Sequence, residues 1–169
     1  MKKIVLIFTM LTFCFSTVSI AQSDIVDVAL SSKDHTTLVA AVKAADLVNT
    51  LKGEGPFTVF APTNAAFDAL PEGTLESLLK PESKSKLASI LTYHVVAGNF
   101  KAADVVAAIK KGGGKFTIKT VNGGTLTASL KGDKVVLIDG NGNTSIITGT
   151  DLKASNGVIH VIDSVVLPK

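Results

Sequence analysis

Residues 57–67, FTVFAPTNAAF, carry the clearest hydrophobic pattern in the chain. Successive side chains of a strand point to opposite faces, and both faces of the first five residues are largely apolar, which predicts a buried central strand. Pro62 cannot donate a hydrogen bond to a neighbouring strand and therefore ends it. Thr63 or Asn64 is then placed to cap a short helix that carries Phe67.

The remaining pattern changes once, from helical spacing to alternation. Helical spacing predicts helices over residues 24–30, 37–51, 75–79, 81–91 and 102–111. Alternation predicts strands at residues 93–96, 116–119, 125–130, 135–138, 145–148 and 157–168. We expect the last of these, GVIHVIDSVVLP, to pair with the strand at residue 57 and close the core. Helices that come first and antiparallel strands that come last indicate an α+β fold.

The first 21 residues have the composition of a secretory signal peptide. Lys2 and Lys3 precede an apolar run that is short for a membrane span, and Ser19-Ile20-Ala21 resembles a cleavage site before Gln22. We therefore expect residues 22–169 to form a single exported domain, without a membrane span. The one cysteine lies inside this leader, so the exported chain would have no disulfide and no thiolate site.

Composition argues against nucleic acid as a partner. The formal net charge is +3 for the whole sequence and +1 without the two leader lysines. The chain contains no arginine and no tryptophan, and arginine is the main residue for bidentate recognition of phosphate and guanine.

The three histidines do not form a predicted catalytic or metal site. His160 and Asp163 lie on one predicted strand, where residues three apart point to opposite faces and cannot bind one ion. His94 follows Tyr93 on another predicted strand, and we expect a structural imidazole bonded to buried backbone or to a side chain near Thr63-Asn64. We expect His35, at a helix start, to be solvated or to cap that helix.

Two glycine-containing segments resemble ligand loops but break the rules for them. Residues 139–150 begin like a calcium loop, DGNGN, yet Thr144 and Thr150 replace the required glycine and glutamate, so a hairpin turn is predicted. Residues 112–115, GGGK, follow a helix and precede a strand, which is the reverse of a phosphate loop. We expect no catalytic residue, no metal and no cofactor.

Three motifs in this order resemble those of the fasciclin domain family. They are residues 57–67, Tyr93-His94 within LTYHVVAG, and residues 156–168, NGVIHVIDSVVLP. The resemblance covers residues 24–169 and implies an antiparallel β-sandwich-like wedge flanked by several α-helices. It implies that the motif residues Thr63, Asn64, Phe67, Asn156, Gly157 and His160 are structural.

The resemblance also implies a bacterial secreted, periplasmic or cell-surface adhesion module without catalysis, which binds a cell-surface or matrix protein or a polysaccharide. In animal members, partner contact is assigned to positions that match Asp151-Leu152 and Tyr93-His94 here. A capping or turn role for Asp151 is the alternative at that position. For a structural His94 and an exposed Asp151, we expect His94→Ala to destabilise the fold and Asp151→Ala to leave it intact.

A second functional hypothesis is a small-ligand carrier. Its pocket would lie between the helices and the sheet, lined by the aromatic residues Phe60, Phe67, Tyr93 and Phe100. Aromatic residues at such spacing also serve simply to fill a core.

Overall fold

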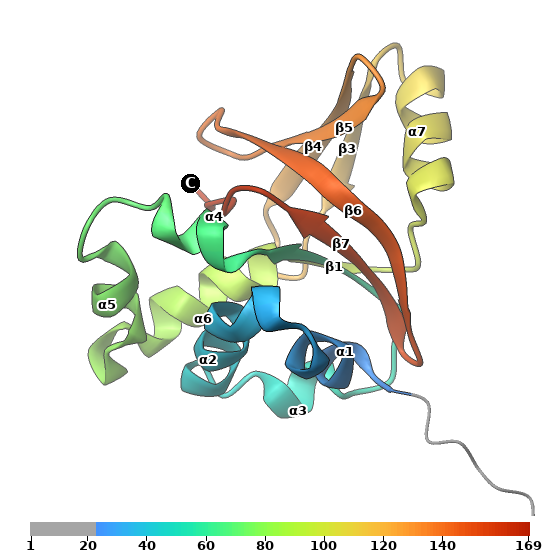
Figure 1. The fold of residues 1–169 in the computed structure, drawn as a ribbon. Helices are drawn as coiled ribbons and strands as arrows, with labels where there is room; N and C mark the ends of the chain where they lie inside the picture. Colours follow the sequence, from blue (N-terminus) through green and yellow to red (C-terminus); the bar gives the residue numbers. More distant parts are fainter. Residues whose placement is uncertain (1–22) are drawn as a thin grey trace, which may run out of the picture.

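The computed structural model describes residues 23–169, in which a group of helices packs on a bent β-sheet (Figure 1). The predicted signal peptide, residues 1–21, lies outside the described residues. The helices are α1 (Ile25–Ser31), α2 (Thr36–Ala44), α3 (Val48–Leu51), α4 (Asn64–Asp68), α5 (Thr74–Leu79), α6 (Lys84–Tyr93) and α7 (Ala102–Lys111), with 3-10 turns at Lys33–His35 and Pro81–Ser83. Within residues 23–169, no helix has both the length and the hydrophobicity needed to cross a bilayer.

The seven strands form one mixed sheet. They are β1 (Phe57–Pro62), β2 (Val95–Ala97), β3 (Lys115–Lys119), β4 (Thr125–Lys131), β5 (Lys134–Ile138), β6 (Thr144–Ala154) and β7 (Gly157–Ile162), in the spatial order β2-β1-β7-β6-β5-β4-β3. β1 and β7 are parallel, and the other neighbouring pairs are antiparallel. The predicted pairing of the first strand with the last is confirmed, and so is the α+β class.

Two hydrophobic cores lie on opposite faces of β1. Val59 and Ala61 pack with helices α1, α2 and α6 in the first core. Phe60 points the other way, into a second core that also takes side chains from β2–β7 and α7. The two halves of the bent sheet therefore face each other as a wedge, and the Val121 N–H donates to the Val95 carbonyl at 2.8 Å where its outer strands meet. The prediction that β1 is buried on both faces is confirmed.

The predicted helix over residues 37–51 is interrupted at Asp46. Asp46 adopts a left-handed conformation with φ 59°, which ends α2 and leaves α3 as a separate turn. The Leu47 N–H reaches back to the Val42 carbonyl at 3.1 Å, and the Asp46 N–H reaches the Lys43 carbonyl at 3.1 Å. These two bonds form a Schellman ending, which aspartate tolerates better than most residues because it can visit the left-handed region.

The predicted strand over residues 93–96 is wrong for its first half. Helix α6 includes Tyr93, and His94 is its C-cap, so β2 begins only at Val95. The β-branched residues Val95 and Val96 indicated a strand, but the preceding helix extends over Tyr93, where the predicted strand began. Tyr93 and His94 are therefore consecutive residues at a helix end and not neighbours on a strand.

The last two strands also differ from the prediction. β6 continues past residue 148 to Ala154, with two register shifts against β7 between Ile147 and Leu152. β7 ends at Ile162, and the remaining residues form a tail that packs against the second core through Val166. The irregular part of β6 does not follow an alternating pattern, which is why the sequence predicted no strand there.

Candidate functional site

Tyr93 and His94 fasten the end of helix α6 to two distant parts of the chain. The Tyr93 hydroxyl donates to the Thr125 carbonyl at 2.6 Å and accepts from the Gly140 N–H at 3.0 Å. Burial raises the pKa of the Tyr93 phenol, the Gly140 N–H opposes this rise, and the Asp139 carboxylate adds to it. Both Tyr93 and His94 are buried, so neither side chain presents a surface to a partner.

His94 bridges helix α6 and the C-terminal tail. Its Nδ1 lies 2.8 Å from the Ile90 carbonyl, and its Nε2 lies 3.2 Å from the Val166 backbone nitrogen. The Val166 N–H is a donor, so Nε2 accepts and Nδ1 carries the proton that reaches Ile90. Burial lowers the pKa of His94 to about 4, and the Ile90 carbonyl opposes this shift. The imidazole is therefore neutral and structural. It is bonded to buried backbone, one of the two kinds of partner that the sequence predicted, and not to a side chain near Thr63-Asn64.

The other motif residues of the first segment join helices to one another. The Thr63 hydroxyl caps α4 by accepting from the Ala66 N–H at 3.3 Å, as predicted. The Asn64 side chain accepts from the Thr37 N–H at 3.0 Å and donates to the Lys33 carbonyl at 3.0 Å, so it caps α2 from another helix. Phe67 is buried in the first core.

The start of the last motif joins the β6–β7 turn to the helical layer. The Asn156 side chain accepts from the Ile25 N–H at 3.0 Å and donates to the Leu51 carbonyl at 2.7 Å. At Gly157 a Cβ atom would collide with the Phe57 carbonyl, so only glycine allows β7 to lie this close to β1.

His35 is not solvated, and although it occupies the N-cap position of α2, its side chain does not cap that helix as predicted. It is buried, and its Nδ1 lies 2.7 Å from the Ser32 hydroxyl oxygen, while no side-chain bond of His35 caps α2. Burial lowers the pKa of His35. Asn64 provides the cap that the sequence assigned to His35, because α4 packs beside the start of α2.

Asp151 lies at the irregular part of β6 and caps helix α7. Its φ of 57° is left-handed, and its Oδ1 accepts from the Ala102 N–H at the start of α7 at 3.0 Å. Its own N–H donates to His160 Nδ1 at 3.4 Å, and His160 Nε2 lies 2.7 Å from the Phe100 carbonyl. The capping alternative for Asp151 is therefore what the structure shows. His160 and Asp163 bind different partners, in agreement with the predicted divergence.

Thr58 is a structural residue of this region that the sequence analysis missed. Its hydroxyl donates to the Gly98 carbonyl at 2.7 Å and accepts from the Phe100 N–H at 2.9 Å, although the residue is fully buried. The available signal was one polar residue within the otherwise apolar strand at residues 57–61. With His160, which stacks on Phe60 at a centroid distance of 5.8 Å, Thr58 holds the segment between β2 and α7 in place.

This rigid support places Leu152 at the surface. Leu152 directly follows Asp151, pairs with Ile159 of β7, and is 42 % exposed. It is one of three large apolar side chains that are clearly exposed within residues 23–169, together with Leu30 and Val121. The arrangement can present an apolar side chain to a partner from a fixed backbone.

Asp139 organises the predicted hairpin turn between β5 and β6. Its Oδ1 accepts from the N–H groups of Asn141 and Asn143, each at 2.9 Å, and its Oδ2 accepts from the Leu167 N–H at 3.0 Å. Internal donors thus occupy the carboxylate that a calcium loop would direct at the ion. In residues 23–169, no three His, Cys, Asp or Glu side chains are grouped closely enough to hold a metal ion.

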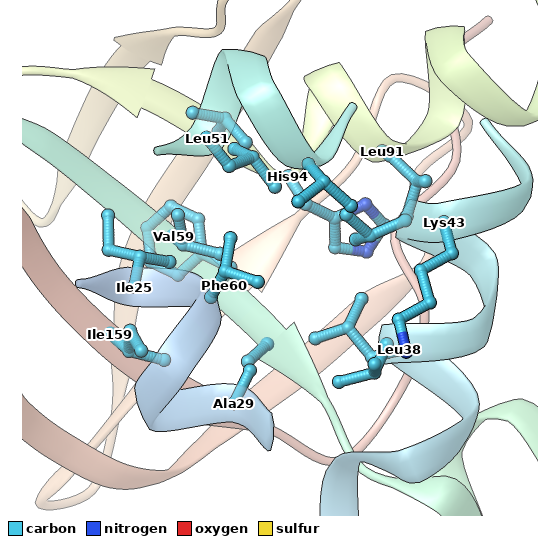
Figure 2. A pocket seen from close by; sticks show the side chains of 16 residues that line it. Ile25, Ala29, Leu38, Lys43, Leu51, Val59, Phe60, Leu91, His94 and Ile159 are labelled. Carbon is cyan, nitrogen blue, oxygen red and sulfur yellow. The ribbon is translucent and has the colours of Figure 1, made fainter. Parts of the chain in front are cut away.

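An apolar cavity of about 40 Å³ lies between the helices and β1 (Figure 2). Its lining includes Ile25, Leu38, Val59, Phe60, Leu91 and His94, and the exposed residue Lys43 marks its rim. Of the four aromatic residues predicted for a carrier pocket, Phe60 lines this cavity, whereas Phe67, Tyr93 and Phe100 do not. Ligand pockets for drug-sized molecules measure several hundred Å³, so this space holds little more than a few water molecules without movement of the helices.

Comparison with known proteins identifies the family. The chain is 53 % identical to protein sll1483 of Synechocystis over 85 % of this chain and 73 % of that protein. It is 34 % identical to the cell surface glycolipoprotein MPB83 of Mycobacterium bovis, over 90 % of this chain and 64 % of that protein. A FAS1 domain pair from the insect cell adhesion molecule Fasciclin I has the same fold, with a TM-score of 0.62 and 18 % identity, over 77 % of this chain and 43 % of that one. The family model for the fasciclin domain matches residues 33–168, so the chain belongs to the fasciclin domain family.

Proposed function

We propose that the protein is a secreted or cell-surface adhesion module that binds a protein or polysaccharide and performs no catalysis. The observation that carries this proposal is the exposed Leu152 on a backbone that Asp151 and His160 hold in one conformation. An apolar side chain on a preorganised backbone loses little conformational entropy on binding, so more of its contact energy appears as affinity. The relatives support the setting, since one is a cell surface protein and a structural neighbour is a cell adhesion molecule.

The contact face is proposed to centre on Leu152 and not on Tyr93-His94. Tyr93 and His94 are at most 2 % exposed, so a partner would reach them only after local unfolding. Asp151 is committed to the Ala102 N–H, and its role at the contact face would be to orient Leu152.

The test is capture of a partner from a surface extract of the host by the immobilised protein. Leu152→Ala is the test variant and Leu30→Ala is its matched control, because Leu30 is a leucine of similar exposure on helix α1. We expect the parent and Leu30→Ala to retain the same molecule, identified by mass spectrometry and sugar analysis. Retention by Leu152→Ala should fall by roughly tenfold, the loss expected at an apolar hot spot.

Two results would contradict this proposal. Equal retention by Leu152→Ala and the parent would place the contact face elsewhere. An absence of specific capture by the parent would remove the support for an interaction module.

A second candidate function is transport of a small apolar molecule, which the cavity beside β1 favours. The cavity is lined by aliphatic side chains from α1, α2, α3 and α6, and these helices would have to separate to admit a ligand. Native mass spectrometry of protein purified from its host tests this function, because a retained molecule adds a discrete mass. A single unliganded mass would count against it.

A further inference from the structure

The charges of the protein are distributed unevenly along the chain. Residues 100–134, which comprise α7, β3, β4 and the start of β5, contain seven lysines and two acidic residues, a formal net charge of +5. The rest of residues 23–169 contains eight lysines and twelve acidic residues, a net charge of −4. The near-neutral total therefore hides a basic lobe, which α7, β3 and β4 form in the upper right of Figure 1.

Four of these lysines share one face of the sheet, which we call the lysine face: Lys115, Lys119, Lys131 and Lys134. Their strand neighbours Ile118, Leu126, Ala128 and Val135 point into the second core, so the lysines point away from it, and all four are exposed. Lys115 pairs with Ser129, and Lys131 pairs directly with Lys134. From the rise per residue of a strand, the lysine face is about 20 Å long.

The lysine face is not neutralised within the protein. In the described part of the chain, the ion pairs join Lys52 to Asp24 and Asp27, and Lys84 to Asp46, all in the helical half. Like charges directly opposite on a sheet, as at Lys131 and Lys134, destabilise the pair of strands. Asp133, in the turn between these two lysines, forms no ion pair with either of them.

Hydroxyl groups fill the spaces between the lysines. Thr117 of β3 lies between Lys115 and Lys119 on the same face, and its partner across the sheet is Thr127. Ammonium groups attract carboxylates over a distance, while hydroxyl groups hydrogen-bond with both carboxylates and sugar hydroxyls. An extended chain of acidic sugars meets both kinds of group along its length.

Other polyanions fit this face less well. Single-stranded nucleic acid needs exposed aromatic side chains for stacking, and the aromatic residues of this lobe, Phe100 and Phe116, pack against the second core. A bilayer surface is normally held by basic residues together with inserted apolar side chains. The clearly exposed large apolar side chain of this lobe, Val121, lies in the turn between β3 and β4, and the lysine face itself carries threonine and serine between its lysines.

We propose that the lysine face binds an acidic polysaccharide along β3 and β4. This inference rests on the proposed function as an interaction module, and it adds a second contact face, separate from Leu152, whose partner is a polyanionic sugar polymer. Lysines act here as point charges, so binding depends on charge density and not on a particular sugar.

The test measures binding of the protein, produced from its full coding sequence, to immobilised polygalacturonate over a range of salt concentrations. Neutral dextran and phosphatidylglycerol vesicles are the comparison surfaces. The test variant combines Lys115→Gln, Lys119→Gln and Lys131→Gln. A control variant with the same total charge combines Lys33→Gln, Lys80→Gln and Lys86→Gln, which are exposed lysines of the helical half.

We expect the parent to bind polygalacturonate more tightly than dextran or vesicles, with an affinity that falls as salt rises. The affinity of the test variant should fall roughly tenfold with a shallower salt dependence, while that of the control variant changes by less than about twofold. Circular dichroism should show the same fold for all three proteins, because exposed lysines are replaced by a polar residue of similar length.

Three outcomes would overturn the proposal: no binding of the parent to polygalacturonate, tighter binding to the vesicles, or an equal loss in the test and control variants. The Leu152→Ala variant separates this inference from the proposed function. If capture from the host extract requires Leu152 but the parent does not bind polygalacturonate, only the proposal for the lysine face is refuted. If polygalacturonate binding requires the lysines but Leu152→Ala captures the host molecule as well as the parent does, only the contact face at Leu152 is refuted.

Discussion

His94 should make the stability of the protein depend on pH in the mildly acidic range. The ordinary pKa of histidine is 6.5, and burial lowers that of His94 to about 4. Between these values the unfolded chain binds a proton that the folded chain does not, so the free energy of unfolding decreases as pH falls from 6.5 to about 4. A proton on Nε2 would also face the Val166 N–H, which now donates to that atom.

The size of the effect follows from the shift in the pKa. A difference between 6.5 and about 4, at about 1.4 kcal/mol per unit, gives a loss of roughly 3 kcal/mol from His94 alone. Domains of this size are stable by about 5–15 kcal/mol, so the loss is large enough to measure by urea unfolding.

The assay compares urea unfolding of the parent and His94→Gln from about pH 7 to about pH 4. Glutamine does not titrate, and it offers an oxygen that can accept from Val166. We expect His94→Gln to be less stable at neutral pH by about 1–3 kcal/mol, because an imperfect fit weakens two buried hydrogen bonds. The decrease in its free energy of unfolding from about pH 7 to about pH 4 should be about 3 kcal/mol smaller than that of the parent.

The carboxylates and His35 titrate in both proteins, so the comparison cancels their contributions. Parallel pH profiles for the parent and His94→Gln would refute the reasoning. His94→Ala, which leaves the Ile90 carbonyl and the Val166 N–H without a partner, should cost about 2–5 kcal/mol at neutral pH. An unchanged melting temperature for His94→Ala would refute the structural role itself.

Substitutions at two further residues, Asp151 and Tyr93, test structural hydrogen bonds by the same unfolding measurement. The structure changes the expectation for Asp151→Ala, which should cost about 1–3 kcal/mol, because alanine loses the bond to Ala102 and disfavours the left-handed backbone. Asp151→Asn keeps an oxygen acceptor and tolerates that backbone, so a loss as large as that of alanine would contradict this account. Tyr93→Phe should cost about 1–3 kcal/mol, because the Thr125 carbonyl and the Gly140 N–H lose their partner, and a stability equal to the parent would show that water replaces the hydroxyl.

The sequence predicted the parts of the fold that depend on local pattern. The apolar faces of β1, the Thr63 cap and the alternating strands after residue 115 follow from periodicity and capping chemistry over a few residues. The pairing of β1 with the last strand was also predictable, because the chain contains two long β-branched runs that need a buried partner.

The features that the sequence did not predict depend on contacts between distant residues. The break at Asp46 depends on the left-handed backbone of this residue. An aspartate inside a helix would look the same in the sequence. The cap of α2 comes from Asn64, which accepts a hydrogen bond from the N–H of Thr37, 27 residues earlier in the chain. The lysine face arises because the pairing of β3, β4 and β5 brings together lysines that are scattered along the sequence.

Three motif residues and Asp151 share one physical task, which is to join distant elements of the fold. Asn64 joins two helices, Asn156 joins the β6–β7 turn to α1 and α3, His94 joins α6 to the C-terminal tail, and Asp151 joins β6 to α7. Each connects elements that the hydrophobic cores alone would leave free to shift, since apolar packing has little directional preference. Residues that satisfy buried backbone groups cannot also bond to a partner without leaving those groups unpaired. Partner contact is therefore expected on exposed positions that this framework holds in place, such as Leu152 and the lysine face.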